Sequence, residues 1–262
     1  MRVEQRKAFT QSSIIRSLSE QNPANSLGAA LCYRYNYLAR TAMTVTSIAA
    51  NAAAIGRKPA PEVRVRRLGL VEYEPAWHAM QKFTAERAAD AADEIWLLEH
   101  PPVYTLGIAG REEHLPRVAN GIPVVRTDRG GQITYHGPGQ IMLYTLLNLR
   151  RRALAVRPLV QLLELTVIDL LADFGIAAAA RVEAPGVYVD GAKIAALGLR
   201  IRDGRCYHGL ALNVDMDLSP FHAIDPCGYS GLAVTQARDL GIADTQDSLG
   251  DRLVHHLLQR LA

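Results

Sequence analysis

The chain has 262 residues, of which 49% are hydrophobic and 21% charged, and its formal net charge is +3. This length suffices for one large domain, and the composition excludes collagen-like, low-complexity and wholly disordered proteins. Three cysteines, Cys32, Cys206 and Cys227, have no C-x-x-C spacing and are too few for a disulfide framework, so we expect a reducing, cytoplasmic location.

The positive charge is concentrated near the N-terminus. Residues 1–62 carry eight Lys and Arg against three Asp and Glu, whereas residues 63–262 carry 21 against 23. A nucleic-acid platform needs a domain-wide positive excess with interleaved aromatic residues, so we expect no nucleic-acid partner. The uncharged stretch at residues 41–56 is too short and too polar to span a bilayer, so we also expect no membrane partner.

We interpret residues 1–62 as an N-terminal extension. This segment is poor in acidic residues and lacks clear periodicity. Three explanations stay open: a disordered extension, a transit peptide, or a start placed upstream of a true start at Met43. The functional domain is therefore expected at residues 63–262.

The first half of this domain predicts short strands around one helix. A strand is expected at residues 63–68, and Pro75 opens a helix as its first residue. Further extended segments are expected at residues 95–98, 103–106 and 122–126.

The second half combines a longer helix with hairpins. The helix opens at Pro158 and ends before Gly175, which suits a left-handed cap, and its apolar stripe indicates core. Asp-Gly pairs at residues 190–191 and 203–204 predict tight turns. These turns join three antiparallel strands, expected at residues 186–189, 192–202 and 205–214.

Lys193 stands out on the middle strand of these hairpins. Alternation puts it on an apolar face, where loss of hydration lowers the pKa of an amine toward that of a proton carrier. The alternative is a lysine at a strand end that reaches water. Alternation places this lysine on one face with Ala195, Leu197, Leu199 and Ile201.

Two loops are candidates for ligand contact. Cys227 lies in a Pro- and Gly-containing loop and could act as a nucleophile if a neighbouring cation favours its thiolate, with Lys193 as the candidate neighbour. Cys206 lies in a predicted strand and is expected to be a small packed side chain. The glycine-rich segment at residues 129–140 is interpreted as a ligand-contact loop that matches no Walker or dinucleotide fingerprint.

The segment RGGQITYHGPGQIMLY, residues 129–144, closely resembles the signature of the lipoyl(octanoyl) transferases, the lipoate-biosynthesis acyltransferases often called LipB. The resemblance covers residues 63–262. Other blocks similar to those of the family follow in the family's order, at residues 99–107, 186–195, 208–214 and 226–228.

The resemblance implies an α+β fold, that of the biotin/lipoate protein ligase catalytic domain, with mixed β-sheets packed with helices. It implies transfer of an octanoyl group from octanoyl-acyl carrier protein to a lysine of lipoyl domains. These acceptors belong to 2-oxoacid dehydrogenase complexes and the glycine cleavage H protein. A thioester on Cys227 would carry the octanoyl group, with Lys193 as acid and base. We expect no cofactor, because the exchange of one thioester for another, and amide formation from a thioester, need neither ATP nor metal. We also expect a monomer.

The family's substrate contacts fall on fourteen positions of this chain. Ala196 departs from the family pattern, where a serine is common, so any contact there would come from the main chain. The positions are Arg129, Gly130, Gly131, Gln132, Ile133, Thr134, Tyr135, His136, Ala196, Leu197, Gly198, Gly209, Leu210 and Ala211.

Other features and alternatives complete the analysis. The histidines show no metal-ligand spacing, and His255 and His256 are expected on the surface of a C-terminal amphipathic helix. Residues 150–152, three consecutive arginines, are either a solvated strand end or a docking site for an acidic carrier protein. Two other functions stay open: an ATP-dependent lipoate or biotin ligase of the same fold, and a non-catalytic binding module, against which Cys227 and Lys193 argue.

Overall fold

The computed structural model describes residues 61–118, 120–225 and 231–262. These residues contain a seven-stranded sheet of order β1-β2-β6-β10-β9-β8-β7 and a three-stranded sheet of order β4-β3-β5. The strands are β1 (Val63–Leu70), β2 (Asp93–Glu99), β3 (Val103–Leu106), β4 (Val124–Arg126), β5 (Ile133–His136), β6 (Gln140–Leu146), β7 (Ala179–Ala180), β8 (Gly186–Val189), β9 (Ala192–Arg202) and β10 (Arg205–Asn213).

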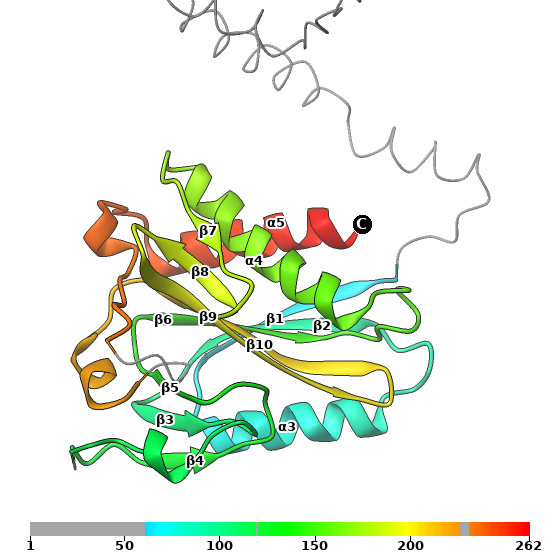
Figure 1. Ribbon diagram of the computed structural model, residues 1–262. Coiled ribbons are helices and arrows are strands. Elements are labelled where there is room, and N and C mark those ends of the chain that lie inside the picture. The colour runs from blue at the N-terminus through cyan, green and yellow to red at the C-terminus, as the bar shows by residue number, and fades with distance from the viewer. Residues whose placement is uncertain (1–60, 119, 226–230) are drawn as a thin grey trace, which may run out of the picture. The chain divides into compact units, whose positions relative to one another are not determined.

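Helices cover both faces of the large sheet. Helices α4 (Val156–Ala172) and α5 (Gln246–Leu261) lie on one face, and α3 (Tyr73–Glu86) lies with the small sheet on the other (Figure 1). Short 3-10 helices are η3 (Glu112–His114), η4 (Ser219–Ala223) and η6 (Arg238–Leu240). Within the described ranges, no helix combines the length and hydropathy needed to cross a bilayer.

Strand pairing follows the predicted hairpins. The pairs β8–β9 and β9–β10 are antiparallel, as are β2–β6 and β6–β10, whereas β1–β2 and β3–β4 are parallel. Both central residues of each hairpin turn have positive φ, 47° and 86° at residues 190–191 and 52° and 76° at residues 203–204. This backbone twist matches that of the flanking strands, which is why Asp-Gly specifies these turns. The three predicted strands are confirmed.

The main core lies between the large sheet and its two helices. Leu159, Leu163 and Val167 project from α4 at helical spacing, and each is 0% exposed. Gly175 has a φ of 74°, which confirms the left-handed position predicted after this helix. Cys206 is fully buried in the same core, and burial raises the pKa of its thiol to about 11, so it is a packing residue.

Element boundaries depart from the prediction mainly at two helix starts and in the segment 129–140. Helix α3 begins at Tyr73 and α4 at Val156, each two residues before the proline that we expected to open it. The segment 129–140 is not a loop throughout, because Ile133–His136 form β5 and Gln140 begins β6. All residues of β5 and β6 are buried. Strand β6 has apolar side chains on both faces and so shows no polar face in the sequence, whereas the alternation of apolar and polar residues in β5 covers only four positions.

Candidate active site

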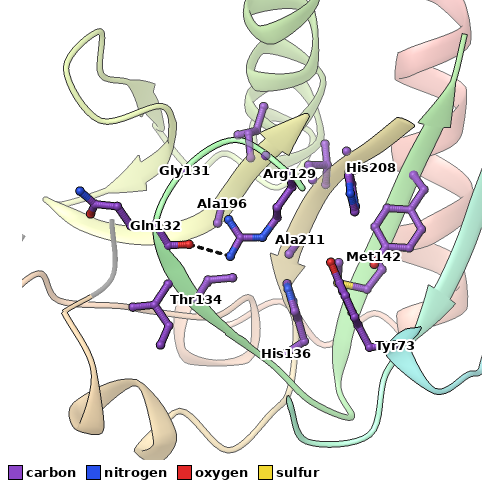
Figure 2. A pocket seen from close by; sticks show the side chains of 16 residues that line it. Tyr73, Arg129, Gly131, Gln132, Thr134, His136, Met142, Ala196, His208 and Ala211 are labelled. Carbon is purple, nitrogen blue, oxygen red and sulfur yellow. Dashed lines mark hydrogen bonds between the residues drawn. The ribbon is translucent and has the colours of Figure 1, made fainter. Parts of the chain in front are cut away.

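A cavity that opens to solvent lies between the large sheet and the small sheet. Its wall comes from β6, β9 and β10, from β5 and the segment before it, and from the start of α3. Figure 2 shows the labelled side chains gathered around Arg129, whose guanidinium reaches into the middle of the cavity. The wall is therefore assembled from segments far apart in the sequence.

The floor of this cavity is a ladder of three strands. Four of the residues that β9 and β10 contribute to it are small, which leaves room above the sheet: Ala196, Gly198, Gly209 and Ala211. Successive rows lie two residues apart, roughly 7 Å along a strand. Strand register aligns two rows across β6, β10 and β9: Met142, Ala211 and Ala196 in the first, and Tyr144, Gly209 and Gly198 in the second.

Arg129 is held by carbonyl and hydroxyl oxygens around the cavity. Its Nη1 donates to the carbonyl oxygen of Gly130 at 2.9 Å, and its Nη2 donates to that of Gln132 at 2.8 Å (Figure 2). Nε and Nη2 also donate to Oγ1 of Thr105, at 3.1 and 2.8 Å. These contacts fix a buried cation against the segment that precedes β5.

A buried chain of hydrogen bonds continues from Thr105 through His136. The Nε2 of Gln140 donates to Oδ1 of Asn213 at 2.8 Å, so its Oε1 is the acceptor 2.8 Å from Nδ1 of His136. The Nδ1 of His136 must therefore carry the proton, and its Nε2 accepts the Thr105 hydroxyl at 3.2 Å. Burial lowers the pKa of His136 well below its ordinary value, which keeps this tautomer neutral.

Asp128 and His208 form a second polar pair at the cavity wall. The Oδ1 of Asp128 accepts from Nε2 of His208 at 3.0 Å and from Nε1 of Trp77 at 2.8 Å. Tyr207 and Gln81 donate to Oδ2. Although burial acts to raise it, these hydrogen bonds hold the pKa of Asp128 below its usual range, so its carboxylate fixes the imidazole of His208.

His208 reaches this wall through an unusual backbone conformation. Neighbouring residues on a strand normally point to opposite faces, yet Tyr207 and His208 both contact Asp128. His208 has a φ of 61°, in the left-handed region, and this turns its side chain to the face that Tyr207 occupies. Burial lowers the pKa of His208, although the Asp128 carboxylate acts to raise it.

The second row of the floor ends in Tyr144, whose hydroxyl is held by a hydrogen bond. The Oη of Tyr144 lies 2.7 Å from Nε2 of His100, and Nδ1 of His100 lies 2.5 Å from the carbonyl oxygen of Val71. A carbonyl only accepts, so Nδ1 carries the proton and Tyr144 donates to Nε2. Burial lowers the pKa of His100 to about 4. Tyr144 is thus anchored at its hydroxyl and presents its ring to the cavity.

Lys193 lies beside the other end of the floor. Its side chain is buried, its Nζ donates to the carbonyl oxygen of Pro185 at 3.3 Å, and it lies 5.2 Å from the centre of the Tyr188 ring. It lines a second, smaller cavity, which shares Thr134 and Ala196 with the first. The two cavities therefore adjoin.

The predicted face of Lys193 is wrong. In the β8–β9 pair, Val187 faces Ala195 and Tyr188 faces Lys193, so Ile194 is an extra residue, a β-bulge. Ile194 and Ala195 both enter the main core, and Lys193 lies on the opposite face with Tyr188. A prediction from strict alternation cannot include one extra residue. That residue moves the strand residues that precede it to the opposite face of the sheet.

Cys227 lies outside the described residues, as does Cys32. The chain resumes at Gly231, and its next residues run alongside Lys193. The Lys193 amide donates to the carbonyl oxygen of Ala233 at 2.8 Å, and the amide of Thr235 donates to that of Lys193 at 3.0 Å. The described segment that follows Cys227 in sequence is thus bound to the Lys193 main chain.

Comparisons with known proteins assign this architecture to a family. Residues 72–257 match the lipoyl protein ligase A/B catalytic domain. An octanoyltransferase from Azoarcus sp. (strain BH72) is 64% identical over 197 residues, which cover 75% of this chain and 87% of that protein. An octanoyltransferase from Aromatoleum aromaticum is 63% identical over 201 residues, 77% of this chain and 86% of that protein.

The chain belongs to the lipoyl protein ligase A/B catalytic-domain family. Its likeness to the octanoyltransferases confirms the resemblance found in the sequence and makes it an acyltransferase. A crystal structure of lipoate-protein ligase A bound with ATP has a TM-score of 0.62 at 14% identity, covering 76% of this chain and 85% of that one. This likeness confirms the predicted biotin/lipoate protein ligase fold.

Most of the predicted substrate contacts of this family member line the main cavity. All fourteen do so except Gly130 and Tyr135. The amide of Gly130 instead donates to the carbonyl oxygen of Leu199 at 2.9 Å and fixes the segment to β9. The ring of Tyr135 packs on the far side of β5, 5.5 Å from the rings of Tyr104 and Phe221.

The sequence analysis missed four residues that line the cavity: Tyr73, Met142, Tyr144 and His208. Met142 and Tyr144 follow Gln140 at a spacing of two, so a strand assignment for β6 would have placed them together. Tyr73 precedes the proline at which we expected α3 to begin. His208 carries no such signal, because its face depends on its positive φ.

The three consecutive arginines at residues 150–152 do not form one docking site in this fold. Arg151 and Arg152 bind the buried carboxylate of Asp93, at 2.9 and 2.6 Å. These two arginines are therefore neither a solvated strand end nor a docking site for a carrier protein. The exposed Arg150 lies at the Gly204 turn. This turn follows the far end of β9, roughly 30 Å along the strand from Lys193 at about 3.3 Å per residue.

Proposed function

We propose that this chain transfers an octanoyl group from octanoyl-acyl carrier protein to a lysine of lipoyl domains through a thioester on Cys227. One observation carries the proposal: a cavity with a floor of small side chains adjoins a second cavity that holds the buried Lys193. The name octanoyltransferase, borne by relatives more than 60% identical, supplies the acyl group.

The floor of the main cavity would hold the acyl chain. An extended eight-carbon chain is roughly 9 Å long, given C–C bonds of about 1.5 Å, and two rows of the floor span a similar length. Burial of each methylene contributes about 0.8 kcal/mol, so the depth of the floor would select chain length. Arg129 and the segment to His136 form the opposite wall and would fix the carbonyl end.

The chemistry needs one nucleophile and one proton carrier. The Cys227 thiol gives its proton to Lys193, the resulting thiolate attacks the octanoyl carbonyl to form the enzyme thioester, and the carrier thiolate leaves and takes that proton from Lys193. The neutral amine of the acceptor lysine then attacks the enzyme thioester, an amide forms, and Cys227 is released as thiolate. Lys193 would accept the proton that this amine loses and pass it to the Cys227 thiolate, which restores the thiol.

The proposal extends to partners and organisation. Octanoyl-acyl carrier protein would be the donor, and lipoyl domains of 2-oxoacid dehydrogenase complexes and glycine cleavage H protein the acceptors. We further propose a cytoplasmic monomer whose catalytic domain spans residues 63–262, with residues 1–62 as an extension. Val63 begins β1, and the family match runs to residue 257, which supports the first boundary and most of the domain's length.

Intact-mass spectrometry tests the proposal. Wild type and Cys227→Ser are mixed with octanoyl-acyl carrier protein without ATP, and apo lipoyl domain is added afterwards. We expect one thiol-labile octanoyl adduct on wild type, which then moves to the lipoyl domain, and none on the variant. Transfer that requires ATP and free octanoate would favour the ligase, and binding without transfer under either condition would favour the binding module.

A further inference from the structure

Helix α4 buries one carboxyl group against the sheet. Glu164 is 7% exposed and lies in a helix whose other buried residues are Leu, Val and Thr. A carboxylate taken out of water is strongly destabilising unless it is paired or hydrogen-bonded. The buried Glu164 carboxylate therefore needs a hydrogen-bond partner, and the identity of that partner indicates the role of Glu164.

That partner is a single peptide group shared with Lys193. The amide of Gly186 donates to Oε1 of Glu164 at 2.9 Å. The carbonyl of the same peptide group, that of Pro185, accepts from Nζ of Lys193 at 3.3 Å. In a planar trans peptide the N–H and C=O point in opposite directions, so Glu164 and Lys193 lie on opposite sides of it. One peptide group thus bridges the carboxylate and the ammonium.

Close packing keeps this peptide group in register with Lys193. Gly186 has a φ of 148°, and a Cβ there would lie 2.7 Å from the carbonyl oxygen of Ala195 and 3.0 Å from Cε of Lys193. The bridge therefore requires glycine at this position. It also requires the bulge at Ile194, which turns Lys193 toward β8.

The bridge is also electrostatic. A negative charge at the N–H end of a peptide polarises its carbonyl oxygen and strengthens the acceptor at the other end. Burial raises the pKa of Glu164, whereas the Gly186 hydrogen bond and the charge of Lys193 lower it. Two titratable groups that face Lys193 are Glu164 from α4 and Tyr188 from β8.

We propose that Glu164 is a positioning residue for Lys193, holding its Nζ and favouring its protonated form through the Pro185–Gly186 peptide. This inference rests on the proposed function, in which Lys193 handles protons. Glu164 does not touch substrate in this scheme. It acts only through the peptide group that it fixes.

The test is the pH profile of single-turnover acyl transfer from octanoyl-carrier to the enzyme. Glu164→Gln keeps an oxygen acceptor for Gly186 and removes the charge. We expect the part of the pH–rate profile that follows the titration of Lys193 to move to lower pH, by up to about one unit, because the ammonium loses a stabilising negative charge. Asp169→Asn is the matched control on the same helix; its partially exposed pair with Arg260 contributes little, so the limb stays in place.

Two outcomes distinguish a failure of this inference from a failure of the proposed function. If Lys193→Ala leaves transfer unchanged, the proposed role of Lys193 fails. If Lys193→Ala abolishes transfer but Glu164→Gln keeps the wild-type profile, only the role of Glu164 fails.

A reciprocal measurement needs no variant of Glu164. Coupling between two sites is mutual, so replacing Lys193 by Met must raise the pKa of the Glu164 carboxyl. Carbon-13 NMR of glutamate-labelled protein measures this titration directly in wild type and Lys193→Met. An unmoved Glu164 signal would overturn the proposal even where Glu164→Gln does not fold.

Discussion

At the scale of single residues, the wall of the cavity is defined by donor and acceptor chemistry. Each member of the chain from Arg129 through Thr105, His136 and Gln140 to Asn213 has one arrangement of donors and acceptors that satisfies all its bonds. The Nδ2 of Asn213 then donates to the carbonyl oxygen of Thr235 at 2.9 Å, in the segment whose main chain is bound to Lys193. A buried network satisfied at every member rigidifies the groups it joins.

Thr105 is the residue on which this chain of hydrogen bonds depends most. Thr105→Val keeps the shape but leaves two Arg129 donors and Nε2 of His136 without the hydroxyl. We expect the free energy of unfolding to fall by about 1–3 kcal/mol, the cost of leaving buried polar groups unsatisfied. Transfer from octanoyl-carrier should also slow. Urea unfolding measures the first effect and single-turnover transfer the second.

Thr105→Ser is the matched control, because it restores the hydroxyl and removes only a methyl group. Nitrogen-15 NMR of His136 adds a direct readout: Nδ1 should carry the proton in wild type and in Thr105→Ser. A Thr105→Val protein with wild-type stability and rate would contradict the role of the hydroxyl.

At the scale of elements, local chemistry made some parts of the fold predictable. Asp-Gly pairs fixed both ends of β9 because only a few residue types accept positive φ at two successive positions. The strands of segment 133–146 were not predicted, because β6 is apolar on both faces and the alternation in β5 covers only four residues of a glycine-rich segment. The bulge at Ile194 and the positive φ of His208 depend on tertiary packing, so the faces of Lys193 and His208 could not follow from spacing.

The row formed by Met142, Ala211 and Ala196 gives a prediction about chain length. Met142→Ala should enlarge the cavity and shift preference toward decanoyl donors, whereas Ala211→Val should shift it toward hexanoyl donors. Each methylene gained or lost changes kcat/KM by about fourfold, since its burial contributes about 0.8 kcal/mol. Transfer from hexanoyl-, octanoyl- and decanoyl-carrier measures the preference.

Leu165→Ala is the control for this series, because it truncates a large apolar side chain that is 42% exposed on α4. It should leave the preference unchanged. If Met142→Ala lowers kcat/KM equally for all three donors, the row does not contact the acyl chain.

At the scale of the whole molecule, one buried carboxylate joins distant parts of the domain. Asp93 is 0% exposed and accepts from Arg87 at 2.7 Å, besides Arg151 and Arg152. Arg152 also donates to the carbonyl oxygens of Pro61, at 3.0 Å, and Leu261, at 3.3 Å. This cluster therefore ties the start of the described domain, the end of α5 and the segment after β6 to the first residue of β2.

Asp93→Asn should consequently destabilise the whole domain. The substitution leaves three arginines around a neutral amide, two of them almost fully buried, and breaking a buried ion pair typically costs about 3–5 kcal/mol. We expect urea unfolding to show a loss of that size. Asp203→Asn makes the same change at an exposed hairpin turn, where Asn-Gly suits the backbone equally well, so its effect should stay within about 0.5 kcal/mol. A similar small loss in Asp93→Asn would mean that the arginines stabilise the domain through their main-chain contacts alone.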